Sequence, residues 1–207
     1  MRLLYGTSNP AKLSHMKEML QGLDVEIVGL SEIKMEVGEI DESGNDPLEN
    51  ARIKAIAYYK LVNMPVFSCD SGLYIEGIDV KRQPGVHVRR VNGKQLKDEE
   101  MIEYYGNIAK ELGGKTKAMY KNAICFIQDE ERIFESMGDE LGSEKFILTS
   151  IPHKNRNKGF PLDSISIDEK SGKYYMDIGD EESYEGKVGD GFRSFFIKAL
   201  NLYRRGE

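Results

Sequence analysis

Short apolar segments alternate with helix-forming segments from Arg2 to Val80, and this order decides the class of fold. Apolar residues recur at helical spacing in 10–20 and 47–62, whereas the segments between are short and bounded by turn residues, as strands are. We expect strands at 2–5, 25–30, 65–69, 73–80, 117–128, 132–141 and 143–150, and helices at 10–20, 47–62, 98–112 and 192–203. Alternating strands and helices followed by hairpins indicate an α/β protein with a mixed sheet.

The bulk properties exclude several classes of protein. The chain has 207 residues, enough for one large domain or two small lobes, and its net charge of −6 argues against a nucleic-acid surface. No apolar run is long enough to cross a bilayer, and Arg2 is not followed by the apolar core of a secretory signal. Cys69 and Cys125 lie in apolar strand-like runs, which is typical of reduced thiols in the cytoplasm.

The loop from Gly6 to Lys12 joins the first expected strand to the first expected helix. Backbone N–H groups at the start of a helix favour an anion, and Thr7, Ser8 and Asn9 add side-chain donors. Lys12, one turn inside the helix, would then face a phosphate chain. An ordinary capped helix explains the same residues, and the loop alone does not decide between the two.

Asp70-Ser71-Gly72 follows a buried apolar run. A carboxylate at this end of a strand lies where α/β sheets usually bind ligands, so Asp70 is a candidate metal ligand or general base. The sequence Asp-Ser-Gly is also typical of a turn.

The acidic loop with Glu39 and Glu42 precedes a helix that carries Lys54. A carboxylate in this loop could therefore share Mg²⁺ with Asp70, while Lys54 contacts phosphates. The alternative is a solvated acidic loop.

Two later segments carry possible ligand residues. Phe160 and Asp163 lie in a loop with Gly159 and Pro161, where an aromatic ring and an acid suit a nucleobase. A loop with one anchored Phe explains them equally well. Lys187 precedes a Gly-rich stretch and Arg193, which also reads as the entry to a helix.

No single segment decides the function, but the order of the segments along the chain is specific. Along the chain they read TSNxxK, ESGN…ENAxxKA, CDSGL, QPGVHVRR, GFPLD and a lysine with an arginine six residues later. This order resembles the inosine triphosphate pyrophosphatase-like family, which hydrolyses non-standard purine nucleoside triphosphates. The resemblance runs from about Leu4 to Leu202 and is most specific in the first half. It implies one domain over 1–207, with a mixed, elongated central β-sheet flanked by helices and two lobes with the active site in the cleft between them.

The resemblance also implies a role for each matching residue. Asp70 would be the general base and, with Glu42, a ligand of Mg²⁺. Asp70, Lys12 and Lys54 would be catalytic, the lysines stabilising charge on the departing pyrophosphate. The implied substrate-binding residues are Thr7, Ser8, Asn9, Lys12, Lys54, Ser71, Phe160, Asp163, Lys187 and Arg193. The implied reaction is hydrolysis of a nucleoside triphosphate to the monophosphate and diphosphate.

The resemblance further implies a homodimer. The Met- and aromatic-rich stretch from Met101 to Tyr105 is consistent with a dimer surface or with a core.

The chain departs from the family pattern at three positions. Cys69 replaces the first of two aspartates, Leu162 replaces a second aromatic residue, and Phe192 replaces a histidine. Three hypotheses therefore stay open: a pyrophosphohydrolase for inosine, deoxyinosine and xanthosine triphosphates that cleans the nucleotide pool, the same scaffold with a shifted nucleotide preference, and a nucleotide-binding protein with little catalysis.

Overall fold

The computed structural model describes residues 1–33, 38, 40–178 and 186–202, and it contains the expected alternation of strands and helices. The strands are β1 (Arg2–Tyr5), β2 (Glu26–Gly29), β3 (Val66–Ile75), β4 (Arg90–Val91), β5 (Lys94–Gln95), β6 (Lys115–Ile127), β7 (Ile133–Ser136), β8 (Phe146–Thr149) and β9 (Ser166–Asp168). The α-helices are α1 (Pro10–Met19), α2 (Pro47–Val62), α3 (Asp98–Glu111) and α4 (Gly186–Ala199). Among the described residues, no helix combines the length and apolar character needed to cross a membrane.

The main sheet is mixed, as the sequence predicts. Its strands follow the order β2-β1-β3-β6-β8-β9, and β7 pairs with β6. β1 is parallel to both β2 and β3, whereas β6 is antiparallel to β7 and β8. β4 and β5 form a separate antiparallel ribbon. The parallel pairs come from the strand–helix–strand part of the chain and the antiparallel pairs from the hairpin-rich part, which confirms an α/β fold with a mixed central sheet flanked by helices.

The chain divides into two compact units, and each has its own apolar core. The first unit comprises 1–71, 122–142 and 187–207, and the second comprises 72–121 and 143–186. The long strands β3 and β6 each contribute residues to both units. The single domain over 1–207 implied by the resemblance stays a prediction.

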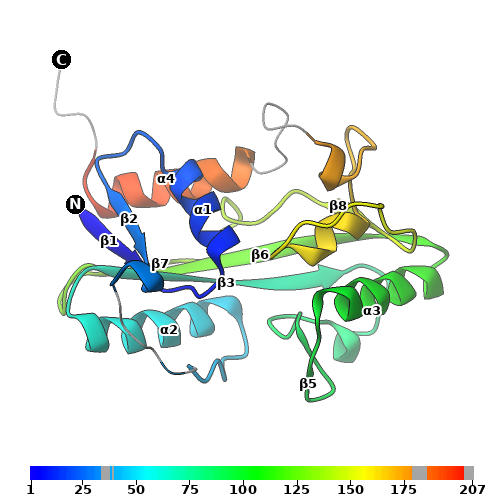
Figure 1. The fold of residues 1–207 in the computed structure, drawn as a ribbon, viewed down its shortest axis with the longest axis horizontal. Helices are drawn as coiled ribbons and strands as arrows, with labels where there is room; N and C mark the ends of the chain where they lie inside the picture. The colour runs from blue at the N-terminus through cyan, green and yellow to red at the C-terminus, as the bar shows by residue number, and fades with distance from the viewer. Residues whose placement is uncertain (34–37, 39, 179–185, 203–207) are drawn as a thin grey trace. The chain divides into compact units, whose positions relative to one another are not determined.

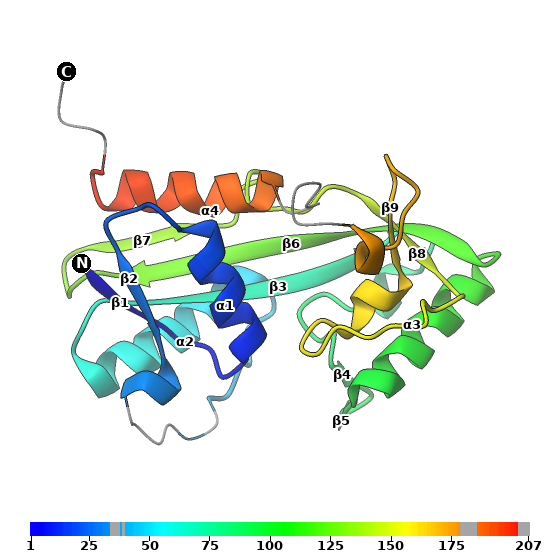
Figure 2. The ribbon, with the colours of Figure 1, turned by 45° about the horizontal axis from the view of Figure 1, so that its top comes forward.

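In the first unit the sheet is buried on both faces, because alternate side chains of each strand enter different clusters. Tyr5 and Phe67 pack with Phe196 of α4 in one cluster, whereas Leu4 and Val66 pack with Tyr58 of α2 in another. Figures 1 and 2 show the same arrangement, with α1 and α4 on one face of these strands and α2 on the opposite face. The period of two therefore decides which helix each strand residue meets.

The core of the second unit forms around α3. Met101, Ile102 and Tyr105 are at most 5% exposed and pack with residues of β3 and β8. The apolar residues of the stretch from Met101 to Tyr105 therefore belong to or pack on the core, Tyr104 included, whereas Glu103 is exposed. As the sequence predicts, α3 ends before Gly113 and Gly114, which have φ angles of 91° and 98°.

Several element boundaries differ from the prediction. The expected strands at 132–141 and 143–150 are shorter, at Ile133–Ser136 and Phe146–Thr149, and β4, β5 and β9 were not expected. One continuous strand, β3, joins the expected strand at 65–69 to the first residues of the one expected at 73–80 and ends at Ile75. Asp70-Ser71-Gly72 therefore lies within a strand rather than in a turn. The strand continues because Leu73 and Ile75 are buried in the second core. α4 begins at Gly186 instead of 192, so Lys187 lies in its first turn. Of the acidic loop, Glu39 lies outside the described residues.

Both cysteines are free, and Cys125 of β6 is fully buried on the face that α2 covers. Burial, followed by the nearby Glu135 carboxylate, raises the pKa of the Cys125 thiol to about 12. An unfolded thiol ionises near pH 9, at about its ordinary pKa. The stabilising contribution of the neutral thiol is therefore complete below about pH 9 and is lost as the pH rises towards the folded pKa.

This linkage predicts a pH-dependent difference between the wild-type protein and Cys125→Ala. The free energy of unfolding of the wild type should fall more steeply above about pH 9, with a difference in slope of up to about 1.4 kcal/mol per pH unit. Urea unfolding under reducing conditions at several pH values measures both curves. The packing defect of the variant lowers its free energy of unfolding by the same amount at every pH. If the two plots of unfolding free energy against pH are parallel, the raised pKa is contradicted.

Candidate functional site

The loop after β1 caps α1 with its own side chains. Oδ1 of Asn9 accepts hydrogen bonds from the backbone N–H of Ala11 (2.9 Å) and Lys12 (3.4 Å). The N–H of Asn9 donates to Oγ1 of Thr7 at 3.2 Å, and Ser8 is exposed. Asn9 is therefore a helix cap, and the N–H donors of the first turn are shared with its side chain. Roles of Thr7, Ser8 and Asn9 in phosphate binding stay predictions.

Backbone pairing places this loop beside β3. The register pairs Tyr5 with Phe67, and the N–H of Gly6 donates to the carbonyl of Phe67 at 2.8 Å. Asp70 lies three residues further along β3, after Ser68 and Cys69. Because β1 and β3 are parallel, Asp70 lies just beyond the carboxyl end of β1, on the side where the loop from Gly6 begins.

Asp70 faces α2 and receives two hydrogen bonds from that helix. Nζ of Lys54 donates to Oδ1 at 3.0 Å, and Nδ2 of Asn50 donates to Oδ2 at 3.1 Å. Asn50 and Lys54 stand four residues apart on α2 and so share one face. Asp70, Lys54 and Asn50 are each at most 8% exposed. The carboxylate is thus buried but fully hydrogen-bonded.

The acidic loop supplies a second carboxylate. Nζ of Lys54 also donates to Oε2 of Glu42 at 3.0 Å. Gly44 fixes this loop, because its N–H donates to Oδ1 of Asn50 at 2.8 Å. A Cβ at position 44 would lie 2.7 Å from Oδ1 of Asn50 and 2.9 Å from its backbone nitrogen, so only glycine fits. Asp46 caps α2 through the N–H of Glu49, as the sequence predicts.

The two lysines of the site respond differently to it. Burial has the largest effect on Lys54 and lowers its pKa, but the charges of Asp70 and Glu42 outweigh it, so that the pKa is raised. Burial and then repulsion from Lys54 lower the pKa of Lys12, against the opposing charge of Asp70. Lys12, Lys54, Asp70 and Glu42 therefore form one electrostatically coupled cluster, which we call the Lys54 cluster.

Cys69 faces away from α2. Its side chain packs against the apolar cluster that includes residues of α1 and α4. Burial raises the pKa of its thiol to about 12, against the opposing effect of Lys54. Cys69 is therefore a neutral thiol at neutral pH and adds no negative charge to the Lys54 cluster. Ser71, the residue after Asp70, is half-buried in β3.

The donor set of the Lys54 cluster suits a magnesium ion bound with a phosphate chain. Within the described residues, no group of three or more His, Cys, Asp and Glu side chains is placed to hold a metal. Glu42 and Asp70 nevertheless present carboxylate oxygens to one common cation, the Lys54 ammonium. Mg²⁺ in phosphate-binding enzymes is often held by one or two carboxylates, with water and phosphate as its other ligands. The pair therefore fits Mg²⁺, and its binding stays a proposal.

The predicted residues of α4 do not join the Lys54 cluster through any contact that we observe in the described chain. Lys187 is exposed in the first turn of the helix. Nη1 of Arg193 donates to the carbonyl of Gln21 at 2.7 Å, beyond the C-terminal end of α1, whereas Thr7 and Asn9 precede its N-terminal end. Phe192, which replaces the family's histidine, is 4% exposed and belongs to the core of the first unit.

Phe160 and Asp163 belong to the second unit. Oδ2 of Asp163 accepts a hydrogen bond from Nδ2 of Asn157 at 2.8 Å, and the N–H of Asp163 donates to the carbonyl of Phe160 at 3.2 Å. Leu162, at the position of the missing aromatic residue, is 4% exposed and lies in the core. Nucleobase binding by Phe160 and Asp163 stays a prediction.

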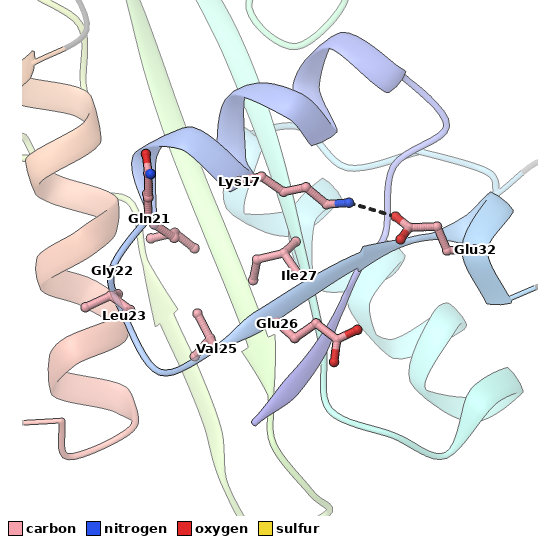
Figure 3. Close-up of a pocket in the computed structure, with 9 residues that line it drawn as sticks. Lys17, Gln21, Gly22, Leu23, Val25, Glu26, Ile27 and Glu32 are labelled. Carbon is pink, nitrogen blue, oxygen red and sulfur yellow. Dashed lines mark hydrogen bonds and ion pairs between the residues drawn. The ribbon is translucent and has the colours of Figure 1, made fainter.

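A surface cavity of about 320 Å³ lies at the other end of α1. It is lined by Lys17, Leu20, Gln21, Gly22, Leu23, Val25, Glu26, Ile27 and Glu32. Figure 3 shows Lys17 directed at Glu32, and their ion pair measures 2.9 Å. None of the predicted site residues lines this cavity, and its charged side chains are exposed. We therefore assign the candidate site to the Lys54 cluster.

Sequence reasoning missed one residue that organises the site. Asn50 belongs to the ENAxxKA segment, but the sequence pattern assigns it no role. Its side chain joins Asp70 to Gly44 and so connects the strand to the acidic loop. The signal was available in the spacing, because a residue four positions before Lys54 on a helix shares its face.

The fold and the site define an α/β protein with a buried acid–lysine cluster beside a strand-to-helix loop. Residues 3–184 match the Ham1 family. The chain is 30% identical over 180 residues to a dITP/XTP pyrophosphatase of Porphyromonas gingivalis, covering 87% of each protein. It is 31% identical over 209 residues to a dITP/XTP pyrophosphatase of Caldanaerobacter subterraneus, covering 97% of this chain and 98% of the relative.

Solved structures share the fold. A HAM1 protein from Coxiella burnetii superposes with a TM-score of 0.75 at 22% identity, covering 96% of this chain and 99% of that one. The Ham1 protein of Staphylococcus aureus has a TM-score of 0.70 at 21% identity, with the same coverage.

The chain belongs to the Ham1 family. This confirms the predicted inosine triphosphate pyrophosphatase-like family, and with it an enzyme of the nucleoside triphosphate pyrophosphatase class, a hydrolase acting on acid anhydrides.

The contacts of Asn50 predict a marked loss of stability in Asn50→Ala. The substitution leaves the buried N–H of Gly44 and one oxygen of Asp70 without their partner, which costs about 1–3 kcal/mol per unsatisfied group. Asn107→Ala, the same change at an exposed position of α3, is the control and should cost less than about 1 kcal/mol. Urea unfolding measures both. Equal destabilisation of the two variants would show that Asn50 does not organise the site.

Proposed function

We propose that this protein is a Mg²⁺-dependent nucleoside triphosphate pyrophosphohydrolase. Its reaction converts a nucleoside triphosphate and water to the monophosphate and diphosphate. The observation that carries the proposal is the Lys54 cluster, in which a buried aspartate is oriented by Asn50 and paired with a lysine. We further propose non-standard purine nucleotides such as ITP, dITP and XTP as substrates, because relatives at 30% and 31% identity are named dITP/XTP pyrophosphatases.

Each residue of the cluster has a distinct role in the proposed reaction. Asp70 accepts the proton of the attacking water, and Asn50 holds its carboxylate in orientation. Lys12 and Lys54 offset the negative charge that builds on the departing diphosphate. Thr7 and Asn9 align the phosphate chain at the start of α1, and Lys187 adds a further positive charge. Mg²⁺, held by Glu42 and Asp70, would neutralise charge on the phosphate oxygens.

The remaining predicted roles concern the base. We propose that Phe160 stacks on the base and that Asp163 accepts a hydrogen bond from a ring N–H. Ser71 contacts the substrate in the same proposal, and Arg193 keeps its predicted role in substrate binding only if its bond to Gln21 is exchanged for one to the nucleotide. A cytoplasmic homodimer completes the proposal, and the free thiols of Cys69 and Cys125 are consistent with a reducing compartment.

A panel of triphosphates with Mg²⁺ tests the proposal. Diphosphate release from at least one non-standard purine triphosphate is expected, and Asp70→Asn should lower kcat by about 10²–10⁴-fold, the usual contribution of a general base. Asp139→Asn, which makes the same change at an exposed position, should keep wild-type turnover. If well-folded wild-type protein releases no diphosphate from any purine triphosphate, the proposed function is wrong.

A shifted nucleotide preference is the second candidate. It is favoured by Leu162 and Phe192, which replace an aromatic residue and a histidine of the family pattern and are both buried in apolar cores. Neither side chain offers a polar group to a base. The same panel decides this by comparing kcat/KM between nucleotides, and a strong preference for inosine triphosphate would reject the shift.

A further inference from the structure

Lys54 holds the two carboxylates proposed as metal ligands. Its Nζ lies 3.0 Å from Oδ1 of Asp70 and 3.0 Å from Oε2 of Glu42. The side chains of Lys54 and Asp70 are only 11% and 12% exposed, so water screens this pair weakly. One ammonium group thus pairs with both acids. Its contact with Asp70 is largely desolvated, whereas the side chain of Glu42 is 39% exposed.

A divalent cation needs the same oxygens. It would have to approach Glu42 and Asp70 while the Lys54 ammonium lies against both, and two cations that close repel each other strongly in a partly buried site. The other oxygen of Asp70 is taken by Nδ2 of Asn50. The Lys54 ammonium in this position therefore opposes the binding of one metal ion by Glu42 and Asp70 together.

From this geometry we infer that Lys54 and a divalent cation compete for Glu42 and Asp70. The consequence for the order in which metal and nucleotide bind rests on the proposed function. A phosphate chain offers Lys54 another anion, so the nucleotide can draw the ammonium away while its own phosphates share the metal. The metal then enters this site together with the nucleotide and binds only weakly before it. By linkage, whatever removes Lys54 from the carboxylates strengthens metal binding.

Metal binding without nucleotide tests the competition. Mn²⁺ alone is titrated into the full chain, and bound Mn²⁺ is measured by calorimetry and by the loss of the free-ion electron paramagnetic resonance signal. Lys54→Met removes the competing charge, and Lys54→Gln does so while keeping a hydrogen-bond donor, should the methionine variant not fold. We expect Mn²⁺ to bind these variants at least about tenfold more tightly than the wild type, since a neighbouring positive charge is lost.

Two further variants identify the cause of any gain. Lys12→Gln removes one positive charge of the same cluster, but the ion pairs of Glu42 and Asp70 are with Lys54, so its gain should stay below about threefold. In Lys54→Gln/Asp70→Asn the gain should disappear, because one of the two carboxylates is gone.

The inference is overturned if Lys54→Gln binds Mn²⁺ no more tightly than the wild type, or if Lys12→Gln gains as much. It is also overturned if the Asp70→Asn double variant keeps the gain, since the metal would then bind elsewhere. These measurements contain no nucleotide and no turnover. A failure of the proposed function, seen as absent diphosphate release, is therefore distinguishable from a failure of the competition.

Discussion

The site depends on one ammonium group that lies between two carboxylates. Asp70 is almost completely buried, and a buried carboxylate without a partner is strongly unfavourable. Lys54 supplies the opposite charge, and the same nitrogen also meets Glu42. The acidic loop, the helix α2 and the strand β3 are thus joined at a single atom. This arrangement concentrates charged groups where a phosphate chain and its metal would have to be received.

The amide of Asn50 makes the charged cluster directional. An ion pair alone attracts in all directions, whereas an amide donates and accepts along defined lines. Nδ2 of Asn50 takes one oxygen of Asp70, and Lys54 takes the other. On its second side the amide binds the N–H of Gly44 and so holds the loop that carries Glu42. The orientation of Asp70, which the proposed general-base role requires, therefore comes from a residue that is not itself ionisable.

Local signals in the sequence predicted much of the fold. Asp46 and Pro47 mark the start of α2 and Gly113 the end of α3, because caps and stops act within a single turn. Other predictions were wrong where packing against a distant core overrides a local preference, as two segments show. Asp70-Ser71-Gly72 has the composition of a turn but continues β3, since Leu73 and Ile75 are buried beyond it. The Gly-rich stretch before Phe192 is helical because Gly191 packs closely on the backbone of Glu140, where a Cβ would lie 2.1 Å from its carbonyl oxygen.

The sequence by itself determined the α/β class, the family and the residue types of the Lys54 cluster. Periodicity and motif order are properties of the chain alone, so they can be read without coordinates. Only the tertiary structure decided which charges share a partner. Lys54 stands 12 residues after Glu42 and 16 before Asp70, and no local pattern reveals that one nitrogen meets both. Such contacts arise where strand and helix faces close on each other, since a residue's periodicity specifies the face it lies on but not the side chain it will meet there.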